Sequence, residues 1–208
     1  MDVVFGIASQ RKRVSYKTLT PRMAARTMRF NILTFIAYEA LWFAVVIGAA
    51  RGYGWLSIGL ALCFIGWQLV ASTQRDVAWR LVGIALVLGA VVDGGAHGLG
   101  LVQYASAAPA LPPGGAPLWI LGLWASFGVT LAGAFRWIAG KPVLGAVLGA
   151  VGGPLSYLGA ARGWATVTFA SPTWHGLAYL AGGWAIALAM LALAARTSST
   201  AQAASIER

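Results

Sequence analysis

The sequence predicts an all-α fold, a polytopic membrane helix bundle of about six transmembrane helices with both termini in the cytoplasm. Three observations carry this prediction: a mean hydropathy of +0.75, six apolar windows long enough to span a bilayer, and a one-sided distribution of Lys and Arg. Only 10% of the residues are charged, against roughly 25% in soluble domains. The composition therefore excludes a soluble enzyme, and a single cysteine, Cys63, excludes a disulfide framework or a cysteine-based metal cluster.

The chain begins with a basic cytoplasmic arm, residues 1–29. This arm carries seven Lys and Arg side chains and Asp2, so it contributes +6 of the net charge of +10. A polybasic segment before a membrane span attracts anionic lipid at about 1 kcal/mol per residue and holds the N-terminus inside. We prefer this interpretation to nucleic-acid binding. The spacing of Arg22, Arg26 and Arg29 predicts a short interfacial helix over Pro21–Phe30.

A six-helix transmembrane bundle is predicted over residues 30–195. A hydrocarbon core of about 30 Å needs about 20 apolar residues in a helix, and long continuous apolar runs do not fit the alternating strands of a membrane barrel. The tail, residues 196–208, is rich in Ser, Thr and Ala, and we expect it to fray in the cytoplasm. The six windows are Phe30–Ala50, Tyr53–Ala71, Leu81–Leu101, Pro117–Phe135, Val143–Ala160 and Trp174–Ala195.

The orientation follows from the basic residues between the spans. Cytoplasmic segments of membrane proteins carry an excess of Lys and Arg. Thirteen of the 15 basic residues fall in the arm, the second and fourth connections and the tail, which all lie on one side of the membrane if the spans alternate. Only Arg51 and Arg162 fall on the other side. This side is therefore predicted to be the outer one.

The fifth span contains a face of small residues. Gly145, Gly149 and Gly153 are four residues apart, so they share one helix face. Such faces let two helix backbones approach closely, which drives helix association in lipid. We interpret this face as a packing seam within the chain, in preference to a dimer interface or a ligand groove.

Pro154 follows this face directly. Proline lacks an N–H and clashes with the preceding turn, so the sequence predicts a kink or a break in the helix. Two hydroxyl groups, of Ser156 and Tyr157, come shortly afterwards. We expect a cavity beside this segment.

Two acids fall within the predicted spans. Glu39 and Asp93 lie roughly 13 and 18 Å from the cytoplasmic edge at 1.5 Å per residue. A charge at this depth costs about 2.5–3.5 kcal/mol, so both should face the interior of the bundle, and both are candidates for function. Glu39, close to Trp42 and Phe43, is interpreted either as a proton carrier or as a hydrogen-bond donor between two helices, and we favour the second.

Asp93 and His97 are four residues apart on one predicted helix face. The pair can hydrogen-bond and act as a general base with an orienting carboxylate. Glycines around the pair are expected to end the helix early and to admit water to His97. The alternative, equally weighted, is a buried hydrogen bond from Asp93 to a neighbouring helix, with Trp124 or Tyr157 as its partner. No further ligand follows at helical spacing, so we expect no metal site.

Several of these residues resemble one family. The matching features are Asn31, Trp42-Phe43, Gly48, Asp93, Pro117-Leu118-Trp119, Trp124, Phe127, the segment Gly149-Ala-Val-Gly-Gly-Pro-Leu-Ser-Tyr157, and Gly159. Over Asn31 to Arg162 the chain resembles the bacterial membrane family known as domain of unknown function 2878. It departs from the family pattern at Glu39, where a Gln or similar residue is expected, and in its long basic arm. The resemblance implies a small polytopic inner-membrane protein without an assigned activity.

Three classes of function fit the sequence. We rank first the binding or modification of a lipid-soluble substrate, with Asp93 and His97 as catalytic groups; whether the protein is an enzyme stays open. The alternatives are a small proton-coupled transporter using Glu39 and Asp93, or a scaffold for another membrane protein. No nucleophile motif, phosphate loop or haem signature occurs, so we expect no cofactor. The expected partner is membrane lipid, with a homo-oligomer or a membrane-protein partner also open. The expected substrate-binding residues are Glu39, Trp42, Trp124, Ser156 and Tyr157.

Overall fold

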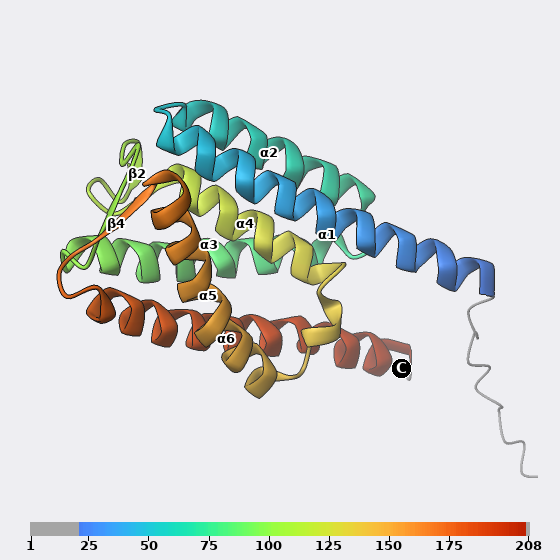
Figure 1. Cartoon of the computed structure of the whole chain (residues 1–208). Helices are drawn as coiled ribbons and strands as arrows, with labels where there is room; N and C mark the ends of the chain where they lie inside the picture. Colours follow the sequence, from blue (N-terminus) through green and yellow to red (C-terminus); the bar gives the residue numbers. More distant parts are fainter. Residues whose placement is uncertain (1–20, 207–208) are drawn as a thin grey trace, which may run out of the picture.

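The computed structural model describes residues 21–206, so residues 1–20 of the predicted arm lie outside the described part. Six α-helices make up most of this part, which confirms the all-α prediction (Figure 1). Each predicted span corresponds to one of these helices. They are α1 (Pro21–Ala50), α2 (Gly54–Ala71), α3 (Arg75–Gly98), α4 (Leu118–Ala132), α5 (Pro142–Trp164) and α6 (Thr173–Ile206).

Five of these helices, all except α4, are long and apolar enough to cross a membrane. Each of the five exposes large apolar side chains on its outer face; examples are Ile36, Leu62, Val87, Val147 and Ile186. An apolar surface of this extent is unusual for a soluble protein, and lipid is the solvent that accommodates it. The chain is a multi-pass membrane protein.

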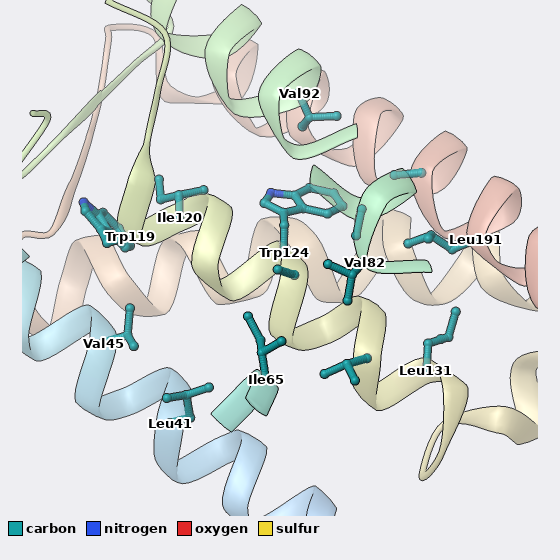
Figure 2. Close-up of a cluster of buried hydrophobic side chains, with 14 of the residues drawn as sticks. Leu41, Val45, Ile65, Val82, Val92, Trp119, Ile120, Trp124, Leu131 and Leu191 are labelled. Atoms are coloured by element: carbon teal, nitrogen blue, oxygen red, sulfur yellow. The ribbon is translucent and has the colours of Figure 1, made fainter. Parts of the chain in front are cut away.

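The shorter helix α4 is the centre of the bundle. Ten of its 15 residues are buried, and it packs against α3, α2 and α1. Figure 2 shows its Trp124 and Leu131 among apolar side chains of the surrounding helices. Glycines of α3 and α4 make this close packing possible: a Cβ at Gly89 would lie 2.5 Å from the Trp124 ring, and one at Gly128 would lie 2.8 Å from the Leu81 carbonyl oxygen.

Short strands join the helices at one end of the bundle (Figure 1). Strand β1 (Val102–Tyr104) pairs antiparallel with β4 (Val167–Phe169), and β2 (Ala110–Leu111) pairs antiparallel with β3 (Ala116–Pro117). The pairing of β1 with β4 links the connection after α3 to the connection before α6.

The opposite end holds the basic connections. A 3-10 turn (Arg136–Ile138) follows α4, and the Gly140 N–H donates to the Ala192 carbonyl oxygen of α6 at 2.9 Å. The Arg80 side chain of α3 donates to the Ala194 carbonyl oxygen at 2.6 Å. The start of α3, the α4–α5 connection and the far part of α6 therefore meet here, with their Lys and Arg.

Three helix ends differ from the prediction by six residues or more. The segment predicted as a short interfacial helix is the first part of α1, which continues into the span because no Gly or Pro occurs between Pro21 and Gly48. Helix α3 begins at Arg75, six residues before the predicted start, so it includes Asp76 in its first turn. Helix α6 continues to Ile206, so the tail predicted to fray is helical as far as Ile206; this stretch lacks Gly and Pro and contains several alanines.

Helix α5 continues through Pro154 as one helix of 23 residues, so of the predicted kink or break, the break does not occur. A proline removes only one hydrogen bond from the ladder, and the bonds on either side hold the helix together. The Ser156 hydroxyl adds a bond by donating to the Gly153 carbonyl oxygen at 2.7 Å.

Candidate functional site

A cavity of about 650 Å³ lies between α1, α4, α5 and α6. Its deep wall consists of buried side chains, including Ile120 of α4 and Leu188 of α6. Its rim is exposed: Phe43 of α1 is 45% exposed and Leu155 of α5 is 60% exposed. The cavity therefore opens sideways between α1 and α5, on the surface that would face lipid. We call it the lateral cavity.

Aromatic rings dominate the lining of the lateral cavity. Eleven of its 25 lining residues are aromatic, although aromatic residues make up only 12% of the chain. Many of the rings contact one another; Tyr38, for example, lies 6.0 Å from Phe127 between ring centroids. Such a wall is suited to an apolar ligand. The eleven are Phe35, Tyr38, Trp42, Phe43, Trp119, Trp124, Phe127, Phe135, Trp137, Tyr157 and Trp184.

The polar lining of the cavity is sparse. The Ser156 hydroxyl donates to a backbone carbonyl of its own helix, and the Tyr157 hydroxyl donates to Asp93. Glu39 is partly buried, and its carboxylate makes no hydrogen bond or ion pair with any residue between 21 and 206. Glu39 is thus the acid of this wall that is available to a ligand, and the indole Nε1 of Trp184 is a neutral donor that also has no partner among these residues.

Asp93 lies behind the cavity wall and is fully buried, at 0% exposure. One carboxylate oxygen, Oδ1, accepts from the Tyr104 hydroxyl at 2.8 Å and also from the Tyr157 hydroxyl. The other, Oδ2, accepts from Trp124 Nε1 at 2.6 Å. This arrangement confirms the alternative prediction of a buried hydrogen bond to a neighbouring helix, with both Trp124 and Tyr157 as donors. Asp93 thereby ties α3 to α4, α5 and β1.

Tyr104 is the member of this network that lies outside the membrane-spanning helices. Burial, together with the nearby charge of Asp93, raises the pKa of its hydroxyl well above the ordinary value. The hydroxyl therefore stays protonated and acts as a donor. This agrees with a carboxylate that accepts three hydrogen bonds.

His97 is not the partner of Asp93. Its Nδ1 lies 3.3 Å from the Val102 carbonyl oxygen, whereas the oxygens of Asp93 are bonded to three other side chains. Neither Asp93 nor His97 is among the residues that line the lateral cavity. The expected pair fails because the chain folds back after α3 and brings Tyr104 to the carboxylate. The catalytic roles suggested for both residues stay predictions.

Helix α3 also does not end early at the glycines around Asp93. It continues through Gly94 and Gly95 to Gly98. A Cβ at Gly94 would lie 3.3 Å from the Ala116 backbone nitrogen, and one at Gly95 would collide with the Tyr179 hydroxyl of α6. These glycines therefore serve close packing around a continuous helix.

The face of small residues on α5 packs against α6 of the same chain, as predicted. A Cβ at Gly145 would lie 2.8 Å from the Leu188 carbonyl oxygen, and Cβ atoms at Gly149 and Gly153 would collide with Trp184. The Trp184 ring in turn stacks on Trp124, with centroids 4.1 Å apart. The glycine face thus sets the position of two rings of the cavity wall.

The expected substrate-binding residues come together in the lateral cavity. Glu39, Trp42, Trp124, Ser156 and Tyr157 are all among its lining residues. The cavity also lies beside Gly152 and Gly153, as the segment around Pro154 predicted. Reasoning from the sequence thus located the cavity, although it placed Asp93 and His97 there as well.

A family model described as "Protein of unknown function (DUF2878)" matches residues 31–190. The chain belongs to this family. The DUF2878 match extends past Arg162 and includes most of α6, so every residue that lines the lateral cavity, from Phe35 to Leu188, falls inside it. No curated protein and no solved structure matches the chain.

Sequence reasoning missed several residues of the site. Tyr38 and Trp184 line the cavity, and Tyr104 bonds to Asp93. Trp184 had a recognisable signal, since it is a lone large ring in an Ala- and Gly-rich stretch of the last span. Tyr104 had none, because its role depends on how the connection after α3 folds back.

Proposed function

We propose that this protein is a bacterial inner-membrane protein that binds a lipid-soluble molecule in the lateral cavity. The observation that carries the proposal is a cavity of about 650 Å³ that is lined by eleven aromatic rings among other apolar side chains and opens toward the side of the bundle. Cavities of roughly 300–1,000 Å³ with an apolar lining and few polar groups are typical of small-molecule sites. A lateral opening lets such a molecule enter from the bilayer.

The inner-membrane location rests on the charge distribution. The described Lys and Arg side chains gather at the end of the bundle where the α2–α3 and α4–α5 connections lie. Such an excess is typical of the cytoplasmic side. The start of α1 and the end of α6 lie at this same end of the bundle, so both are then cytoplasmic (Figure 1).

Binding of a molecule is favoured over a reaction catalysed by Asp93. The oxygens of Asp93 already accept three hydrogen bonds, and the carboxylate lies behind Tyr157 and Trp124. A general base needs hydrogen-bond reach to the proton that it abstracts. A molecule in the lateral cavity would meet Tyr157 and Glu39 before it met Asp93.

A scaffold that uses the glycine face of α5 is disfavoured by the packing. Gly145, Gly149 and Gly153 are buried against α6 of the same chain. This face has no room for a second protein. A scaffold would have to use another surface.

The experiment is the identification of molecules that co-purify with the protein in mild detergent, by native mass spectrometry and lipid extraction. The test variant is Gly152→Phe. Gly152 lines the cavity and has open space where its Cβ would be, so the ring fills the cavity without a backbone clash. The matched control is Gly66→Phe, at an exposed glycine of α2 that also has open space and does not line the cavity.

The wild-type protein and Gly66→Phe should retain the same lipid-soluble molecule, and Gly152→Phe should lose most of it while eluting as a folded protein. Equal retention in all three proteins would contradict the proposal. So would the absence of any specific molecule from the wild-type protein.

A further inference from the structure

The lateral cavity contains a single carboxylate and no basic side chain. Among its 25 lining residues Glu39 is the only acid, no Lys, Arg or His occurs, and the other titratable groups are the hydroxyls of Tyr38 and Tyr157. The Tyr157 hydroxyl is already bonded to Asp93. The charge available to a ligand in this cavity is therefore negative.

The Glu39 carboxylate has no partner within the described part of the chain, residues 21–206. Acids inside membrane-spanning helices usually pair with another group, because an isolated charge is costly in lipid. Asp93 follows this rule with three donors, and Glu39 does not. A bound molecule with a positive charge would supply the missing partner.

The rings around Glu39 are suited to the same kind of molecule. Phe35, Trp42 and Phe43 are three or four residues from Glu39 on α1, so they lie on adjoining turns of the same helix face. Trp42 and Phe43 contact edge to face, with centroids 5.0 Å apart. The faces of Trp, Tyr and Phe rings attract cations, most strongly when water is excluded.

We propose that the lateral cavity binds a lipophilic organic cation, whose positive charge pairs with the Glu39 carboxylate while the aromatic wall encloses its apolar groups. This inference rests on the proposed function and specifies its ligand class. It requires a molecule that is both membrane-soluble and charged, such as a hydrophobic amine, phosphonium or quaternary ammonium ion. An anionic ligand of the same shape meets a carboxylate, aromatic faces and neutral donors such as Trp184 Nε1, but no cationic side chain among the lining residues.

The probe that tests this is a pair of ions of nearly the same size and shape, tetraphenylphosphonium and tetraphenylborate. Binding of each to the purified protein in neutral detergent is measured by equilibrium dialysis. The wild-type protein should bind the phosphonium ion about tenfold or more tightly than the borate ion, a difference of about 1.4 kcal/mol. Glu39→Gln should remove this preference, and Glu39→Asp should keep part of it.

The controls separate the effect of the Glu39 charge from the effects of misfolding and of a filled cavity. Asp76→Asn removes an exposed acid at the start of α3 that does not line the cavity. This variant should bind both ions as the wild-type protein does. Gly152→Phe should weaken binding of the phosphonium ion while leaving Glu39 intact. Size-exclusion chromatography and helical content show whether each variant is folded.

The proposal is overturned if the wild-type protein binds both ions equally, if it binds neither, or if folded Glu39→Gln keeps the preference for the phosphonium ion. Even with one of these results, the proposed function is still supported if a neutral lipid-soluble molecule co-purifies with the wild-type protein and is lost in Gly152→Phe. If nothing co-purifies and Gly152→Phe has no effect on either ion, both proposals fail.

Discussion

Two acids within the bundle, Asp93 of α3 and Glu39 of α1, have opposite surroundings. Asp93 is fully buried and accepts three hydrogen bonds from three other elements. Glu39 is partly buried beside a cavity and has no partner in residues 21–206. The first arrangement holds the bundle together, and the second leaves a polar group free to meet a ligand. A second contrast concerns two helix pairs: α5 packs tightly on α6 through glycines, whereas α1 and α5 flank the cavity and touch through rings such as Phe43 and Trp164.

Removal of the buried acid should give the largest loss of stability. Asp93→Ala leaves the donors of Tyr104, Trp124 and Tyr157 without their acceptor. At about 1 kcal/mol for each donor, the free energy of unfolding should fall by about 3 kcal/mol. SDS-titration unfolding in mixed micelles measures this change.

The comparison variant is Glu39→Ala, which should change the free energy of unfolding by less than about 0.5 kcal/mol, as usual for a substitution that breaks no buried interaction. Similar losses for the two variants would show that the two acids do not differ in role.

Two glycines of α5 should respond differently to the same added methyl group. A Cβ at Gly149 would collide with the Trp184 carbonyl of α6, and one at Gly152 would meet open space. Gly149→Ala should therefore cost about 2 kcal/mol through overpacking. Gly152→Ala should stabilise α5 by about 0.5–1 kcal/mol, because Ala favours a helix more than Gly does.

The same unfolding assay checks this pair. A result in which Gly149→Ala is as stable as Gly152→Ala would contradict the tight α5–α6 seam.

Two tyrosines that line the cavity provide the smallest expected difference. Tyr157→Phe removes one of three donors to Asp93, so it should cost about 1 kcal/mol. Tyr38→Phe removes a hydroxyl with no hydrogen bond in the described part of the chain, and should have almost no effect. Thermal unfolding followed by tryptophan fluorescence resolves this difference, and equal melting temperatures for the two variants would count against the Asp93 network.

The helices could be predicted from the sequence because their signals are local. Apolar length and flanking basic residues placed each span, with most ends within a few residues of the observed ones. The glycine face and the cavity were also predictable, since Gly145, Gly149 and Gly153 share a face whatever lies opposite it. The effects of Gly and Pro were less predictable. The glycines after Asp93 were expected to end α3 early, and Pro154 was expected to kink or break α5, but both helices are continuous through these residues.

The difference between the two acids could not be predicted. Both lie in the middle of apolar spans, so hydropathy and depth describe them alike. Their partners depend on the rotation of each helix and on the connection that brings Tyr104 back to α3. The spacing of Asp93 and His97 suggested a pair on one helix face, yet donors from other elements occupy the carboxylate.

The most direct test is an electron cryomicroscopy map of the protein in lipid nanodiscs, with the wild-type chain and Gly152→Phe compared. The account predicts non-protein density between α1 and α5, beside Glu39 and the Trp42 ring, that is lost in the variant. A wild-type map in which side chains close this space, or in which its density is no stronger than that of bilayer lipid along the outer face of α2, would contradict it.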